Sequence, residues 1–293
     1  MKTLTQIAKS PQLKHLRRTL PVSIILLLSS CGIQDIASVQ EFASLTRKAN
    51  EKYPALVADF YNSCVRTAEF DTDTIPSRQE IADRCDRFQK LQPGLLAINQ
   101  VLESYIFALG SLASDQTIVF DDEFKNLSSA VGSLPSARPQ QIDAVTSLIN
   151  FLVSARVDNY RREELAHVIA NSNNALQITL KTQKDIFSSD YKRLLLIESD
   201  TIDDFYREKL LQLQNNPEKL LYVRQQWQEE KVLVNQKLSA VNDYLQILEQ
   251  VGKAHQELYD NRNRLNSAAL SQTMLQYTYK LKPLIENLIK TFS

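Results

Sequence analysis

Glycine is scarce in this chain of 293 residues, with five occurrences at positions 32, 94, 110, 132 and 252. An average protein uses glycine at about 7% of its positions. Phosphate-binding loops, tight hairpin turns and nucleotide crevices use glycine repeatedly, because glycine adopts positive φ angles and lets the backbone approach closely. The sequence therefore argues against folds built around such loops.

An excess of basic charge is also missing, since the chain has 34 basic and 34 acidic residues. The first 30 residues hold five of the basic residues and none of the acidic ones. Removal of this leader would leave 29 basic and 34 acidic residues, a net charge of −5. Nucleic-acid binding calls for a basic face, so we expect no nucleic acid partner.

The sequence offers no recognisable catalytic or metal-binding motif. It has no Gly-x-Ser-x-Gly nucleophile elbow. Glu164 and His167 have the Glu-x-x-His spacing of di-iron carboxylate bundles. That site needs a second copy of the motif, and His255 has Gly252 where the second glutamate should stand. We therefore expect no catalytic residue, no metal site and no cofactor.

The leader is the clearest feature that is present. It carries a basic segment followed by the apolar run 20–28, which is followed by two serines. The run is roughly half of the 20 or so residues that a permanent membrane-spanning helix needs. This pattern predicts a signal peptide over residues 1–30. The alternatives are a secretory signal cut elsewhere, or an accidental apolar stretch in a cytoplasmic protein.

Leu28-Ser29-Ser30-Cys31 closes the leader and resembles the lipobox of bacterial lipoproteins. In that family the cysteine thiol receives a diacylglycerol, the leader is cut before the cysteine, and the new amino terminus is acylated. The resemblance implies that Cys31 is the lipidation site, that palmitate can be attached there, and that residues 31–38 are a lipidated tether. Gly32 is not the Asp that marks inner-membrane retention, so the resemblance favours the outer membrane and leaves its periplasmic or surface face open.

The mature chain shows the helical period, because apolar residues recur at steps of three and four. We expect an all-α fold, an elongated bundle of long antiparallel helices with coiled-coil-like segments. A disulfide-pinned hairpin region would cover residues 39–134 and a long-helix bundle residues 135–293, with one continuous domain as the alternative. The expected helices are 34–52, 54–72, one from Ser77 with a kink or break at Pro93-Gly94, 122–134, 139–187, 191–215, 217–264 and 267–290.

Cys64 and Cys85 lie at equal distances from a predicted turn near residue 74. Antiparallel helices would bring them level, and each falls on an apolar stripe that faces the neighbouring helix. Such a geometry satisfies the Cα separation that a disulfide requires, and an exported protein meets oxidising conditions. We predict a Cys64–Cys85 disulfide; the alternative is a pair of buried free thiols.

The run from Leu95 to Val119 is the most apolar part of the mature chain. It is typical of a buried central helix, and also of the membrane-inserting head of helical pore-forming toxins. Our leading interpretation is a non-catalytic lipoprotein of the cell envelope whose helical bundle acts as a scaffold or binds a protein partner. A membrane-active protein of the pore-forming kind comes second, and an enzyme with an unrecognised site third.

Overall fold

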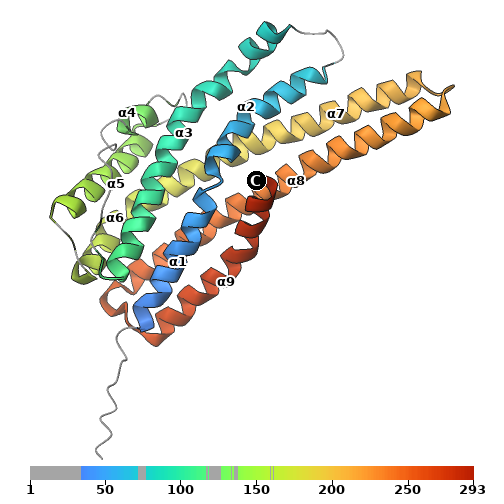
Figure 1. Cartoon of the computed structure of the whole chain (residues 1–293). Helices are drawn as coiled ribbons and strands as arrows, with labels where there is room; N and C mark the ends of the chain where they lie inside the picture. Colours follow the sequence, from blue (N-terminus) through green and yellow to red (C-terminus); the bar gives the residue numbers. More distant parts are fainter. Residues whose placement is uncertain are drawn as a thin grey trace, which may run out of the picture. The chain divides into compact units, whose positions relative to one another are not determined.

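The structure is a computed structural model that describes residues 34–71, 77–116, 118, 127–132, 134, 138–158, 160 and 162–293. The described residues form one compact unit, whose helices are drawn in Figure 1. All regular structure in the described ranges is helical, which confirms the all-α prediction. The predicted lipobox and Cys31 lie outside the described residues.

Nine α-helices fall within the described ranges, together with three short 3₁₀ or π segments. In chain order the α-helices are α1 (Gln34–Asn50), α2 (Tyr53–Glu69), α3 (Arg78–Ala113), α4 (Leu127–Gly132), α5 (Pro139–Val157), α6 (Leu165–Ile186), α7 (Lys192–Gln212), α8 (Pro217–Asp260) and α9 (Ala268–Thr291).

Side-chain caps explain where three of the long helices begin. Ser77 caps α3 through a complete capping box, in which its hydroxyl accepts from the Glu80 backbone N–H and the Glu80 carboxylate accepts from the Ser77 N–H. Asn216 caps α8, and Ser267 caps α9. Each cap satisfies backbone donors that have no partner within the helix. These starts are at the positions that the sequence predicted.

α3 lies at the centre of the unit and packs against α1, α2, α4, α5 and α6. Leu95, Ile98, Leu109 and Leu112 are fully buried on it, and one core cluster joins residues from both regions 39–134 and 135–293. α3 is also the one described helix with the length and hydropathy to cross a membrane, although 67% of its most apolar window is buried. Burial of this kind is also typical of a core helix in a soluble protein.

α3 runs without a break through Pro93, where the sequence predicted a kink or an interruption. Gly94 follows it, and a Cβ at this position would overlap the side chain of Leu134. The glycine therefore allows the segment after α4 to approach the backbone of α3 closely.

The predicted helix 139–187 is two helices in the structure, whereas the predicted helix 191–215 corresponds to α7. α5 ends at Val157, and a 3₁₀ turn over Arg162–Glu164 precedes α6. α5 and α6 pack against each other, so the chain must reverse here although no glycine or proline marks the place. Conversely, α6 passes into α7 through a π-helical turn, Phe187–Tyr191, where the sequence predicted a break.

Candidate functional site

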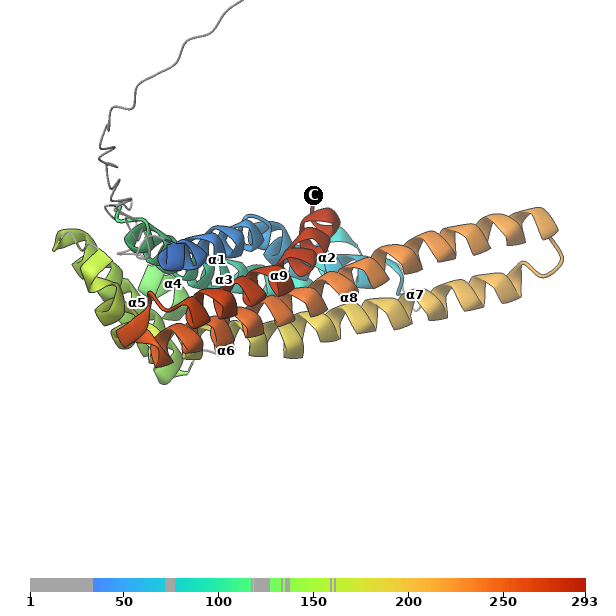
Figure 2. The ribbon, with the colours of Figure 1, turned by 90° about the horizontal axis from the view of Figure 1, so that it is seen from below.

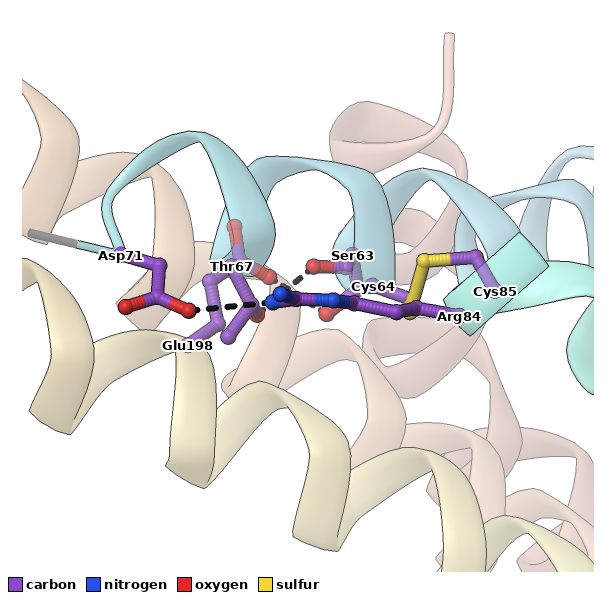
Figure 3. Close-up of a disulfide and its surroundings, with 7 residues drawn as sticks. All are labelled: Ser63, Cys64, Thr67, Asp71, Arg84, Cys85 and Glu198. Carbon is purple, nitrogen blue, oxygen red and sulfur yellow. Dashed lines mark hydrogen bonds and ion pairs between the residues drawn. A yellow bond between two sulfur atoms is a disulfide. The ribbon is translucent and has the colours of Figure 1, made fainter. Parts of the chain in front are cut away.

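The disulfide prediction is met in the structure, because Cys64 of α2 is bonded to Cys85 of α3 with their Cα atoms 5.7 Å apart. Figure 3 shows the bond between the two antiparallel helices. Nearer the turn, Arg84 Nη1 donates to Asp71 Oδ2 at 3.1 Å. Closing a loop with a sequence separation of 21 stabilises the fold by about 3 kcal/mol in the chain-entropy model.

Next to Cys64, the side chain of Ser63 points away from the disulfide and donates to Glu198 of α7 (Figure 3). Glu198 is 1% exposed, and it also accepts from Arg66 Nη2 at 3.1 Å. A buried carboxylate requires such partners, because isolated charges are costly to remove from water. This group of residues, which we call the ionic cluster, consists of Asp59, Ser63, Arg66, Tyr191, Glu198 and Lys237.

Asp59 holds the other half of the ionic cluster together. Its carboxylate accepts from Arg66 at 3.0 and 3.1 Å, from Lys237 of α8 at 2.8 Å and from the Tyr191 hydroxyl at 2.6 Å. The π-helical turn brings Tyr191 inward, where its ring stacks on Phe60 with centroids 4.5 Å apart. The ionic cluster therefore clamps α2 to α7 and α8.

The electrostatics of the ionic cluster favour fixed charges. Burial opposes the charge on Arg66, but hydrogen bonds to Glu198 and Asp59 outweigh it, so the pKa of Arg66 is raised. Burial, together with the neighbouring charge of Asp59, raises the pKa of Tyr191 well above its usual value. Each carboxylate accepts several hydrogen bonds, and these hold the charges of the ionic cluster in fixed positions between α2, α7 and α8.

A second polar cluster, the neutral cluster, lies around His255 and consists of Tyr105, Ser172, Asn173 and His255. The Tyr105 hydroxyl is 2.5 Å from His255 Nε2, and His255 Nδ1 is 2.9 Å from Asn173 Oδ1. Ser172 Oγ donates to the Tyr105 hydroxyl at 2.6 Å. Burial lowers the pKa of His255 to about 3, so the imidazole is uncharged at neutral pH.

The residues singled out for a metal site lie in different environments. His167 is exposed and hydrogen-bonds to Asn171 at 2.7 Å, Glu164 ends a 3₁₀ turn, and His255 is fully buried. In the part of the chain that the structure describes, no three His, Cys, Asp or Glu side chains gather as metal ligands would.

The far ends of α7 and α8 run past the other helices, as Figure 2 shows. We call residues 202–234 the arm. Its interior has its own small core, made of Ile202, Tyr206, Val223 and Val234. Trp227 Nε1 donates to Asp203 Oδ1 at 2.8 Å, and Lys231 Nζ lies 2.7 Å from Asp203 Oδ2. The arm is therefore internally packed.

The outer face of the arm carries four large, exposed apolar side chains, which sequence reasoning missed. Leu221 is 70% exposed, Tyr222 62%, Val232 53% and Leu233 52%. The helical period places Val234 and Val241 toward the inside and leaves these four outside. The sequence did contain a signal for these residues. A helix that packs on one side needs only one apolar stripe, so apolar residues elsewhere on α8 indicate a second apolar surface.

Two surface grooves complete the candidate sites. One, of about 450 Å³, lies between α3 and α7 and is lined by Phe88, Leu194, Arg87 and Arg193. The other, of about 460 Å³, lies between α6 and α8. Its Glu249 accepts from Lys253 at 2.7 Å and from Lys184 at 2.9 Å, and these hydrogen bonds lower its pKa to about 2. Its main charges are therefore paired with one another.

No protein family matches the sequence, and no curated protein and no solved structure is significantly similar to it.

Proposed function

We propose that this protein is a non-catalytic lipoprotein of the bacterial cell envelope, anchored in a bilayer through acylated Cys31, that binds a protein partner through the arm. The observation that carries the proposal is the row of four large apolar side chains on the outer face of the arm, each more than half exposed. Because the arm has its own packed interior, these side chains are not needed for its folding.

A protein surface fits this row better than a small ligand does. The row lies on one convex helix, whereas small molecules bind in concave pockets. Protein interfaces are enriched in aromatic residues and depleted in charge at their centres, and the row combines Tyr222 with three aliphatic residues. Leu221 and Tyr222 form one exposed apolar pair on this face and Val232 and Leu233 form another, and exposed apolar patches mark interaction sites on soluble surfaces.

Anchoring is tested by replacing Cys31 with serine in the full-length chain. We expect loss of palmitate labelling and accumulation of the uncleaved precursor, because the serine hydroxyl does not replace the thiol that accepts the diacylglycerol. Unchanged labelling would overturn the anchor. Each buried CH₂ group contributes about 0.8 kcal/mol, so several acyl chains hold a protein on a membrane far more firmly than one chain does.

Partner binding is tested by a photo-crosslinking amino acid at Tyr222, with Tyr279 of α9 as the matched control. Tyr279 is 75% exposed, so it samples solvent at least as well but lies outside the arm. In the native envelope we expect a discrete crosslinked protein from position 222 and none from position 279. Equal crosslinking from both positions, or none from either, would overturn the proposal.

The second candidate, a membrane-active protein of the pore-forming kind, is favoured by the length and hydropathy of α3 alone. Insertion of α3 would expose the core cluster that it shares with the surrounding helices. Leakage of dye from liposomes distinguishes the two functions. A scaffold leaves the dye inside, and dye release at low protein concentration would favour the pore-forming function.

A further inference from the structure

The ends of several helices gather at one end of the unit, opposite the arm. α1, α6 and α9 begin there, and α3 and α8 end there, as Figures 1 and 2 show from two directions. The contacts agree with this arrangement, because the 3₁₀ turn Arg262–Arg264, between α8 and α9, packs on α6, and the 3₁₀ turn Arg162–Glu164 packs on α3. We call this end the base, and within the described residues it comprises 34–37, 112–116, 162–164 and 259–267.

The predicted lipid anchor is close to the base in the sequence. Two residues, Gly32 and Ile33, separate Cys31 from Gln34, where α1 begins. A fully extended chain covers about 3.5 Å per residue, so the three steps from Cys31 to Gln34 reach about 10 Å at most. An acylated Cys31 would therefore hold the base at the surface of the bilayer.

The side chains of the base suit a headgroup region. Arg262 lies with its guanidinium carbon 4.5 Å from the centre of the Tyr259 ring, and Arg264 is exposed. Tyrosine is enriched at membrane–water interfaces, and arginine binds phosphate groups well. Asp260 and Glu163 are exposed there too, so the base carries both signs of charge. The acyl chains, and not a basic surface, provide most of the attraction to lipid.

α8 connects the base to the arm. Near the base, His255 of α8 bonds to Asn173 of α6, and in the arm Lys231 of α8 bonds to Asp203 of α7. Leu233 lies 27 residues before Asp260, the last residue of α8, and Leu221 lies 39 residues before it. At 1.5 Å per residue, the row of exposed apolar residues begins about 40 Å from the base and ends about 60 Å from it.

The outer face of the arm is poorly suited to lie in the bilayer. Glu218 and Glu229 are exposed, and each lies three residues before a member of the row, Leu221 or Val232. Residues three apart lie on the same side of a helix, so lipid that covered the row would also remove these carboxylates from water. Burial of charges without partners is costly, which favours an arm that projects into the aqueous compartment.

We propose that the short tether holds the base on the bilayer and directs the arm away from it, so that the partner of the arm presents its binding surface about 40–60 Å from the membrane that carries the anchor. This inference rests on the proposed function and states where its partner binds. A protein that projects less than this distance from the same bilayer would not reach the row.

The test uses the full-length, lipidated chain in liposomes whose lipid headgroups carry a nitroxide, which quenches only nearby fluorophores. The cysteines of the disulfide are bonded to each other and Cys31 is acylated, so an added cysteine is labelled selectively. The label is placed at Asn263→Cys in the base, at Gln225→Cys beside the row, or at Asn215→Cys at the tip of the arm; all three positions are exposed.

We expect loss of most of the fluorescence at position 263 and no loss at positions 225 and 215. Equal quenching at the three positions would show that the unit lies flat on the membrane. Absence of quenching at position 263 would show that the base is not at the bilayer. Either result would overturn the proposal.

A longer tether tests the cause of this orientation. A flexible Gly-Ser linker of about twenty residues, inserted between Gly32 and Ile33, spans about 25 Å on average, so we expect the quenching at position 263 to decrease. The same linker inserted between Asn215 and Asn216, in the turn from α7 to α8, is the matched control and should leave that quenching unchanged. An equal effect of the two insertions, or no effect of either, would contradict the role of the tether.

Failure of this inference is distinguishable from failure of the proposed function. If palmitate labelling depends on Cys31 and the photo-crosslinker at Tyr222 captures a protein, but the label at position 263 is not quenched, the orientation is rejected and the anchored, partner-binding protein stands. If Tyr222 gives no crosslink, the partner and its distance are rejected, and quenching still decides the position of the base. If the chain is not acylated, both proposals are rejected.

Discussion

The helical unit contains two buried polar clusters, and these provide hydrogen-bond partners for their buried groups in different ways. The ionic cluster joins α2 to α7 and α8 through charges, and the Arg66 side chain within it keeps 26% of its surface exposed. The neutral cluster around His255 is fully buried at its imidazole and contains hydroxyl, amide and imidazole groups. The ionic cluster thus keeps its arginine partly in contact with water although its two carboxylates are buried, whereas the neutral cluster holds no charge.

This difference follows from the cost of desolvation. A charged pair that is removed from water loses more hydration than a pair of neutral groups does, and it recovers that loss only with near-complete hydrogen bonding. Glu198 and Asp59 each accept from two or more donors. The ionic cluster should therefore be the more sensitive to loss of one member, and the neutral cluster the more sensitive to pH.

The largest expected effect is that of Glu198→Ala. It leaves the Ser63 hydroxyl and part of the Arg66 guanidinium without acceptors in a largely buried place, so we expect a loss of about 3–5 kcal/mol in the free energy of unfolding. Urea denaturation measures it. Asp204→Ala is the control, because Asp204 is exposed and pairs with Arg207 on the surface; its expected change is within about 0.5 kcal/mol.

The second prediction asks whether the covalent bond or the ionic cluster fixes α2. Reduction of Cys64–Cys85 should cost about 3 kcal/mol or less and leave the helical content intact, because the ionic cluster and the core contacts of α2 remain. Thermal melts followed by circular dichroism, with and without reductant, measure both quantities. Loss of all helicity on reduction would mean that the disulfide organises the whole unit.

The sequence correctly predicted the parts of this fold that local signals determine. The capping residues Ser77 and Ser267 are at helix starts, and the equal spacing of the two cysteines about one turn identified the hairpin. These features depend on neighbours close in the chain. One helical period and one turn are enough to predict them.

The parts that were missed depend on residues far apart in the chain. Arg66 and Glu198 are separated by 132 residues. The helical period shows which face of its helix each residue lies on, but not which other helix that face contacts. The reversal between α5 and α6 is similar, because Tyr160 and Phe151 contact each other there without a glycine or proline in the sequence. Packing determines both features.

The third prediction concerns the pH dependence of the neutral cluster. The pKa of His255 is about 3 in the folded protein and 6.5 in its unperturbed state, so the unfolded chain binds the proton first as the pH falls. The stability that depends on neutral His255 is therefore complete above about pH 6.5 and decreases below it. Between pH 7 and pH 5 we expect a loss of about 2 kcal/mol.

His255→Gln isolates this contribution, because an amide does not titrate but can accept from Tyr105 and donate to Asn173. Denaturation at pH 7 and pH 5 should show a smaller pH dependence in this variant than in the native protein. His167→Gln, which removes an exposed imidazole, should keep the native pH dependence. Equal pH dependence in the native protein and His255→Gln would show that this histidine is not buried uncharged.

The smallest expected effect is that of Ser172→Ala, at about 1 kcal/mol. The Ser172 hydroxyl lies 2.6 Å from both the Tyr105 hydroxyl and the Val168 carbonyl, but Tyr105 keeps its hydrogen bond to His255 when the serine is removed. No charge is left unpaired, so the cost stays far below that of Glu198→Ala.

Ser147→Ala is the matched control, since its hydroxyl also bonds the carbonyl four residues earlier but is exposed. There we expect no loss, because alanine has the higher helix propensity. Urea denaturation of both variants at pH 7 compares them, and a Ser172→Ala cost equal to that of Glu198→Ala would contradict the distinction between neutral and charged clusters.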